Sequence, residues 1–225
     1  MNALAKGEAE ILIYEYIGRD YFGEGVSPKS FAEELKAFGD IRKLHVRINS
    51  PGGDVFDGNT IYNILRNHQA YIEVHIDGIA ASVASVVAMV GDKIIISENA
   101  MMMIHDPWAI VGGEADEMRK MAEVLDKIKT TFISAYKNKS GLSERVISNM
   151  MSEETWLNAA EAIKHGLADE SEEPVKAAAS FDLSCFKNAP ATFAKQPRRV
   201  TNEEAERRSR SYESRKRQIE MIAAT

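Results

Sequence analysis

Hydrophobic residues along most of the chain recur at two different spacings. Short runs of alternating or β-branched residues predict strands, and apolar residues three or four apart predict helices. The predicted strands are Glu10 to Gly18, Lys43 to Asn49, Tyr71 to Ile76 and Lys93 to Ser97. The predicted helices follow Ser27, Gly53, Ser82 and Ser143, cover Glu114 to Tyr136, and follow Asn158. Because strands and helices take turns along the chain, we expect an α/β fold with a largely parallel sheet flanked by helices.

Polar and small residues mark several of these element ends. Ser27 precedes a proline, which is typical of a helix N-cap followed by the first helical position, and Gly39 would end that helix. Asn158 lies three residues before Glu161, the spacing of a capping box, and Gly166 would end that last helix.

The regular pattern weakens near residue 170. At 225 residues the chain can bury one substantial core, so we expect one domain over 1–170. An acidic, helix-breaking stretch then opens a partly disordered linker over 171–200. The remaining 201–225 form a basic tail that Thr201 could cap as a helix. The residues from Lys195 to Thr225 include nine Lys or Arg and five Asp or Glu, so this stretch is basic. A solvated tail is the simpler interpretation, and an interaction arm is the alternative.

Composition and charge limit which partners and compartments we expect for this protein. The net charge of −6 gives no reason to expect a nucleic-acid partner for the core. Cys185 is the single cysteine, so no intrachain disulfide can form and a reducing compartment is expected. No secretory signal is visible at the N-terminus, and the longest apolar stretch, Ile79 to Val90, is too short to span a bilayer. We therefore expect a cytoplasmic protein without a membrane partner.

Ser82 lies at a predicted strand-to-helix junction, a position typical of a nucleophilic side chain. The predicted strand Tyr71 to Ile76 ends in a small-residue turn, Asp77 to Ala81, and an apolar helix starts directly after Ser82. A serine at such a corner presents its hydroxyl outward, beside the free N–H groups that begin a helix. Ser82 is therefore a candidate nucleophile.

A serine nucleophile needs a base, and the chain offers five histidines. His45 and His75 lie inside predicted strands and are most simply structural. His68 and His165 lie near helix ends, where a cation is favoured. His105 differs because it follows a strand and precedes a Pro-Trp turn. Its position makes it the candidate base, although position alone still favours a structural role.

Three motifs in register resemble those of the proteolytic subunit of the Clp protease, peptidase family S14. They are Asn49 to Gly53, Gly78 to Ser82 and Met103 to Pro107, and the likeness covers roughly Glu10 to Asp169. It is nearest to the branch found in tailed bacteriophages and prophages, which serves as head-maturation (prohead) proteases. The features that favour this branch are Gly53 to Gly58, Asn99 to His105 and Glu154 to Leu157.

The resemblance implies a site residue by residue. Ser82 would be the nucleophile of a serine endopeptidase, His105 its general base and Glu154 the acid that orients the base. Backbone N–H groups of Gly53 and Val83 would form the oxyanion hole, and a side chain at Gly53 would obstruct the peptide carbonyl that approaches it.

The acid departs from the usual family pattern. The proteolytic subunit more often has aspartate at the position of Glu154, and neighbouring Glu153 is the alternative. A glutamate can also hold an imidazole in the needed tautomer, so the departure is compatible with activity.

The resemblance also implies a ClpP/crotonase-like fold of spiral strand-helix units, without metal or organic cofactor. Subunits would form rings as homo-oligomers, with the long helix Glu114 to Tyr136 at the ring-to-ring contact. The substrate would be a polypeptide, with a capsid or scaffold precursor as one candidate. The short chain before Glu10 argues against docking to a Clp ATPase. Two alternatives stay open: a crotonase-type acyl-CoA enzyme, and a non-catalytic capsid-assembly scaffold.

Overall fold

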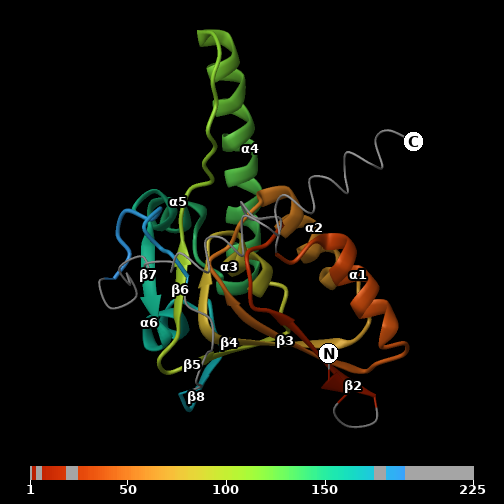
Figure 1. Ribbon diagram of the computed structural model, residues 1–225. Coiled ribbons are helices and arrows are strands. Elements are labelled where there is room, and N and C mark those ends of the chain that lie inside the picture. Colours follow the sequence, from red (N-terminus) through yellow and green to blue (C-terminus); the bar gives the residue numbers. More distant parts are fainter. Residues whose placement is uncertain (1, 4–6, 19–24, 175–180, 191–225) are drawn as a thin grey trace, which may run out of the picture.

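A computed structural model describes residues 2–3, 7–18, 25–174 and 181–190 (Figure 1). Its strands are β1 (Asn2–Ala3), β2 (Glu8–Ile13), β3 (Lys43–Ser50), β4 (Tyr71–Ala81), β5 (Lys93–Ser97), β6 (Met101–Ile104), β7 (Thr155–Asn158) and β8 (Glu170–Glu172). Its helices are α1 (Pro28–Ala37), α2 (Val55–Arg66), α3 (Val83–Ala88), α4 (Ala115–Ser140), α5 (Glu144–Ser152) and α6 (Ala159–Lys164). The predicted basic tail and most of the predicted linker lie outside the described residues.

The strands form one sheet in the order β1-β2-β3-β4-β5-β8, and β6 pairs with both β4 and β7. All neighbours from β2 to β8 along this path are parallel, as are β4 and β6, whereas β1–β2 and β6–β7 are antiparallel. The predicted α/β fold with a largely parallel sheet is therefore confirmed.

The predicted helix caps are present. The Ser27 hydroxyl accepts a hydrogen bond from the Ser30 N–H at 3.1 Å, with Pro28 at the first helical position. Asn158 and Glu161 form the reciprocal capping box of α6, each side chain accepting from the other's backbone N–H at 2.9 Å. These bonds satisfy N–H groups that a helix start leaves without partners, so they fix where each helix begins.

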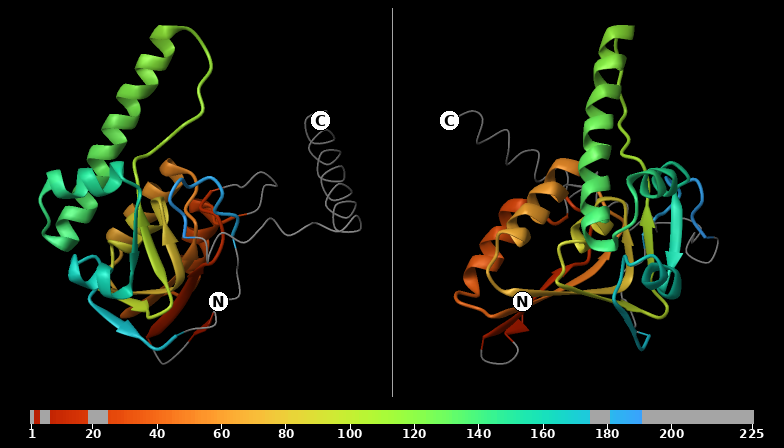
Figure 2. Two further views of the ribbon diagram at one scale, coloured as in Figure 1. Left: turned by 90° about the vertical axis from the view of Figure 1, so that its left-hand side faces the viewer. Right: turned by 180° about the vertical axis from the view of Figure 1, so that it is seen from behind.

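The two faces of the sheet differ in chemistry. Apolar side chains of β2, β3 and β4 alternate toward the face on which α1, α2 and α3 lie, and form the main core with them (Figures 1 and 2). The intervening residues point to the other face, where no described helix lies. They are largely charged or polar: Glu8, Lys43, His45, Arg47, Glu73, His75 and Asp77. A parallel sheet is usually apolar on both faces, so this polar face is unusual for its class.

Strands β4 and β8 include residues that the sequence had assigned to a turn and to a linker. The small-residue stretch Asp77 to Ala81 is not a turn, because β4 continues through it and pairs Ile79 to Ala81 with β6. The acidic stretch after Asp169 is not wholly linker, since Glu170–Glu172 forms β8 beside β5. In both places backbone pairing overrides side chains that disfavour strands.

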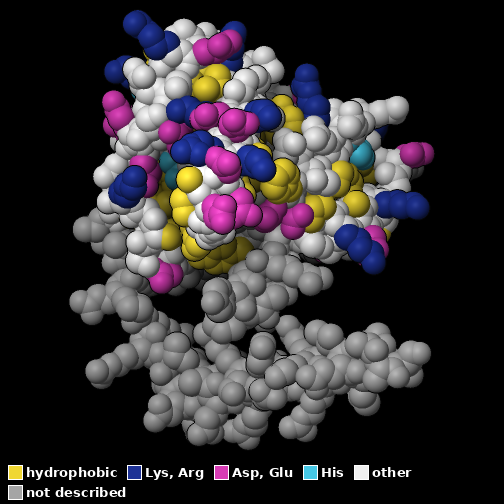
Figure 3. All heavy atoms as spheres, turned by 90° about the horizontal axis from the view of Figure 1, so that it is seen from above, with side chains coloured by type: hydrophobic (Ala, Val, Ile, Leu, Met, Phe, Trp, Pro, Cys, Tyr) yellow, Lys and Arg dark blue, Asp and Glu magenta, His cyan; other side chains and the backbone are white. Residues whose placement is uncertain are grey.

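Helix α4 extends well beyond the rest of the molecule (Figures 1 and 2). Only Phe132, Ala135 and Tyr136, near its C-terminal end, are buried. Seen from above, hydrophobic side chains emerge among charged ones at this end of the molecule (Figure 3). None of the described helices combines the length and apolar character needed to cross a membrane.

Candidate active site

Ser82 occupies a strained corner between β4 and α3. Its φ of 55° and ψ of −132° lie in a region that L-residues rarely adopt. The Ser82 N–H donates to the Met103 carbonyl at 3.0 Å, and the Ser85 hydroxyl donates back to the Ser82 carbonyl at 2.6 Å. Ser85 itself is fully buried, so it packs behind the corner. The backbone bonds on both sides hold the strained conformation in place.

Gly52 lies directly against the Ser82 side chain. A Cβ built on Gly52 would come 2.7 Å from the Ser82 Cβ and 2.7 Å from the Ala81 carbonyl oxygen, and Gly52 also has a φ of +96°. Both the space and the backbone angle therefore require glycine here.

His105 follows β6 and reaches the same corner. The register between β4 and β6 pairs Ala81 with Met103, which places the residues that follow each strand side by side. His105 Nε2 lies 2.8 Å from Ser82 Oγ, a normal hydrogen-bond distance. Burial lowers the pKa of His105, and the negative charges of Glu154 and Asp106 offset only part of this effect. The imidazole is therefore biased toward its neutral, proton-accepting form.

The predicted oxyanion donors, Gly53 and Val83, belong to segments beside Ser82: Gly53 lines the same hollow as Ser82, and Val83 follows Ser82 in the chain. Val83 is the first residue of α3, where an N–H has no partner within the helix. Gly53 has a φ of +149°, and a Cβ there would come 2.1 Å from the Ile17 carbonyl oxygen. The structural need for glycine at 53 thus comes from the backbone of Ile17.

Glu154 is held by donors other than the imidazole. It is 8% exposed, and its carboxylate accepts from Asn188 N at 2.6 Å, Lys187 N at 2.9 Å and Trp156 Nε1 at 3.2 Å. Burial alone would raise the pKa of Glu154, but these bonds together lower it below its ordinary value. Within the described residues no hydrogen bond joins Glu154 to His105, so the carboxylate acts on the imidazole by charge.

The segment 181–190 belongs to this site, which the sequence did not indicate. Leu183 is buried in a small cluster with Ile79 and Met103. The Phe186 ring contacts the rings of His105 and Trp156 edge to face, with centroids 5.5 and 5.8 Å apart. The sequence did carry one signal for a packed segment here: a short apolar pattern in an otherwise polar stretch, made by Phe181, Leu183 and Phe186.

A hollow of about 330 Å³ opens beside Ser82 and His105. Gly53 lies on its wall next to the serine, and apolar side chains of α4, among them Met121, Leu125 and Ile128, line much of the rest. A predominantly apolar hollow beside a serine and a histidine can hold an extended peptide with an apolar side chain.

Comparison with known proteins identifies the family. Residues 28–173 match the family described as Clp protease. The chain belongs to the Clp protease family. Members of this family are serine-type peptidases, classed as S14.

Curated relatives in the Clp protease family are about a third identical to this chain over the residues that align. The ATP-dependent Clp protease proteolytic subunit 1 of Chlamydia muridarum is 29% identical over 161 residues, covering 67% of this chain and 84% of that protein. The ATP-dependent Clp protease proteolytic subunit of Morus indica is 34% identical over 133 residues, covering 58% and 68%.

A solved structure in the Clp protease family has the same fold. A ClpP1 mutant from Listeria monocytogenes superposes with a TM-score of 0.64 at 22% identity, covering 75% of this chain and 93% of that chain. The segment 181–190 lies beyond the part that matches the family.

Proposed function

We propose that this protein is a serine endopeptidase that cleaves peptide bonds through an acyl-enzyme on Ser82. The observation that carries the proposal is the 2.8 Å contact between Ser82 Oγ and His105 Nε2 at a strained strand-to-helix corner. A serine in hydrogen-bond contact with a neutral imidazole is the arrangement that nucleophilic catalysis requires.

The reaction follows from these positions. Ser82 Oγ attacks the peptide carbonyl carbon while His105 Nε2 takes the hydroxyl proton. The negative oxygen that develops accepts hydrogen bonds from the Gly53 and Val83 N–H groups, each typically contributing about 3 kcal/mol of transition-state stabilisation. His105 then gives its proton to the leaving amine, and water hydrolyses the acyl-enzyme by the same route in reverse.

Glu154 is the proposed acid of the triad. When His105 takes the serine proton it becomes a cation, and the nearby carboxylate stabilises that cation. Glu153 fits this role less well, because its side chain is exposed and the contact that it makes with the 181–190 segment is through its backbone carbonyl. The proposed triad is therefore Ser82, His105 and Glu154.

The proposed substrate is a polypeptide with an apolar side chain next to the cleaved bond. The apolar lining of the hollow beside Ser82 supports this, since burying such a side chain is favourable by about 25 cal/mol per Å² of apolar surface. The sequence motifs shared with phage and prophage head-maturation proteases support a capsid or scaffold precursor as the natural substrate.

Assembly into rings of identical subunits is also proposed. The N-terminal part of α4 supports it, because this part extends beyond the rest of the molecule and carries exposed apolar residues such as Met118. Exposed apolar surface of this kind marks a contact with another chain. In this arrangement α4 would form the ring-to-ring contact.

Covalent labelling with a fluorophosphonate, read by intact mass, tests the proposed function. We expect one label per chain in the wild type and none in Ser82→Ala. Ser134→Ala is the matched control, because Ser134 is exposed on α4 and its hydroxyl donates to the Thr130 carbonyl of the same helix; it should label like the wild type. Equal labelling of Ser82→Ala and the wild type would exclude the acyl-enzyme, as an acyl-CoA enzyme or a non-catalytic scaffold would predict.

A further inference from the structure

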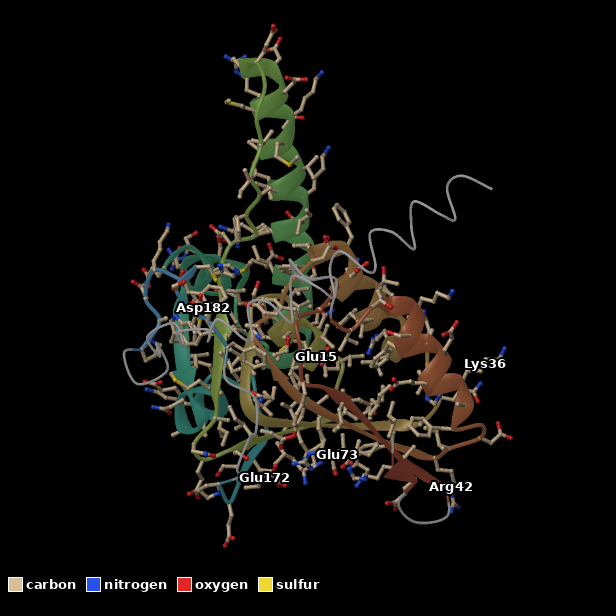
Figure 4. The ribbon with its side chains drawn as sticks, in the orientation of Figure 1. Glu15, Lys36, Arg42, Glu73, Glu172 and Asp182 are labelled. Atoms are coloured by element: carbon tan, nitrogen blue, oxygen red, sulfur yellow. The ribbon has the colours of Figure 1, made fainter. Side chains whose placement is uncertain are left out.

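Three side chains converge on the polar face of the sheet, away from Ser82. His45 lies on β3, and Glu73 and His75 lie on β4. His45 pairs directly with Glu73 in the strand register, and residues two apart on a strand share a face, so all three point to the same side. Figure 4 labels Glu73, together with Glu172 of β8, on the side of the sheet away from α4. Glu73 and His75 are each 8% exposed.

The three inner atoms form a nearly equilateral triangle. His45 Nδ1 lies 3.3 Å from His75 Nε2, and Glu73 Oε1 lies 3.2 Å from each of these nitrogens. Zinc bonds to histidine nitrogen and carboxylate oxygen are about 2.0–2.2 Å long, so one edge of a tetrahedral zinc site measures about 3.4 Å. The triangle therefore has the dimensions of one face of such a site.

The outer histidine nitrogens have carboxylate partners. His75 Nδ1 lies 3.3 Å from Glu172 Oε1, and His45 Nε2 lies 3.7 Å from Glu8 Oε2. A metal-bound histidine characteristically directs its other ring N–H to a carboxylate, as His75 is placed to do toward Glu172, and this fixes the ring's orientation and tautomer.

The inner atoms of the three side chains are suited to hold a cation. A carboxylate only accepts hydrogen bonds, so the His75 nitrogen that faces Glu172 at 3.3 Å carries a proton. A neutral His75 then presents a bare inner nitrogen to the Glu73 oxygen, which is also only an acceptor, and a cation bound between them would satisfy both atoms. Among the described residues, Lys43 is the one lysine that contacts this triangle: its Nζ lies 3.0 Å from Glu73 Oε1.

We propose that His45, Glu73 and His75 bind a divalent transition-metal ion, with Zn²⁺ as the best fit. Two imidazole nitrogens and one carboxylate oxygen suit zinc and cobalt rather than magnesium or calcium, which prefer oxygen ligands. Water completes the fourth position. The ion displaces Lys43, whose side chain is 31% exposed and can turn to solvent. The site cross-links β3 to β4, so its role is structural and independent of the proposed peptidase activity.

Metal binding to the untagged, full-length, chelator-treated protein tests this proposal. We expect one Co²⁺ per chain with the visible absorption of a tetrahedral site, displaced by Zn²⁺, and a melting temperature that rises with added Zn²⁺. His75→Gln should abolish the absorption and the thermal shift. His165→Gln is the matched control at the end of α6, outside the cluster, and should bind like the wild type.

Two further variants keep the test decisive if His75→Gln fails to fold. Glu172→Gln should weaken Zn²⁺ binding by about 10–100-fold, the usual effect of losing an outer carboxylate. Lys43→Gln removes the competing ammonium and should tighten binding. The proposal is overturned if His75→Gln or Glu172→Gln binds Zn²⁺ as tightly as the wild type. It is also overturned if wild-type binding is absent, or is lost in Cys185→Ser or His105→Ala.

Discussion

Replacing Gly52 by alanine tests whether packing behind Ser82 sets the catalytic geometry. The new Cβ would lie 2.7 Å from the Ser82 Cβ, whereas ordinary contacts begin at 3.4 Å, so the two atoms must part by about 0.7 Å. If Ser82 moves away from His105 by that amount, their 2.8 Å contact lengthens to about 3.5 Å, which is no longer a good hydrogen bond. Displacements near 1 Å can reduce rates by about 100-fold, so we expect fluorophosphonate labelling to slow by roughly that factor.

The same substitution also strains the backbone. An alanine at a φ of +96° should lower the free energy of unfolding by about 1–3 kcal/mol. Gly39→Ala separates the two effects, because Gly39 has a φ of +65° but open space where its Cβ would stand. It should lose about 1–2 kcal/mol of stability and keep the wild-type labelling rate. If Gly52→Ala labels as fast as Gly39→Ala, contact with Gly52 does not position the nucleophile.

Two further predictions concern the surroundings of the serine. Burial lowers the pKa of His105 below its ordinary value, so labelling should persist to lower pH than a free imidazole would allow and fall only when His105 is protonated. Glu154→Gln removes a charge that raises this pKa, so the pH at which labelling is half-maximal should fall. Lys187→Gln removes a charge that lowers this pKa, so that pH should rise. Shifts of the two variants in the same direction would contradict this. Tyr136→Phe removes a buried hydroxyl that lies 2.8 Å from Ser85 Oγ. The free energy of unfolding measured in urea should fall by about 1 kcal/mol, while labelling persists. An unchanged free energy of unfolding would show that this bond does not stabilise the fold.

Local signals in the sequence predicted most of the framework. The caps at Ser27 and Asn158, and the apolar alternation of β3, depend on residues within a few positions of one another. The Ser82 corner was also predictable, because β4 ends and α3 begins within two residues. Its exact shape was not, since Gly78 and Ala80 favour a turn while backbone pairing with β6 keeps them in a strand.

Contacts between distant segments explain what the sequence could not predict. The two amides that hold Glu154 follow it by more than thirty residues, and nothing local marks Lys187 or Asn188 as its partners. His45 and His75 were interpreted separately as structural residues of two strands. The register between β3 and β4 brings them together, and an alternating pattern does not specify register across thirty residues.

The backbone N–H groups of Lys187 and Asn188 that bind the Glu154 carboxylate are synthesised late, and this affects when the site is complete. A ribosome releases the chain from its N-terminus, so Ser82 emerges about 105 residues and His105 about 80 residues before these two amides. Until the segment 181–190 follows, the Glu154 carboxylate lacks two of its three hydrogen-bond donors. A growing chain would thus carry the proposed nucleophile and base long before the proposed acid is fixed. Synthesis itself would delay full activity of the proposed peptidase until the segment 181–190 has been made.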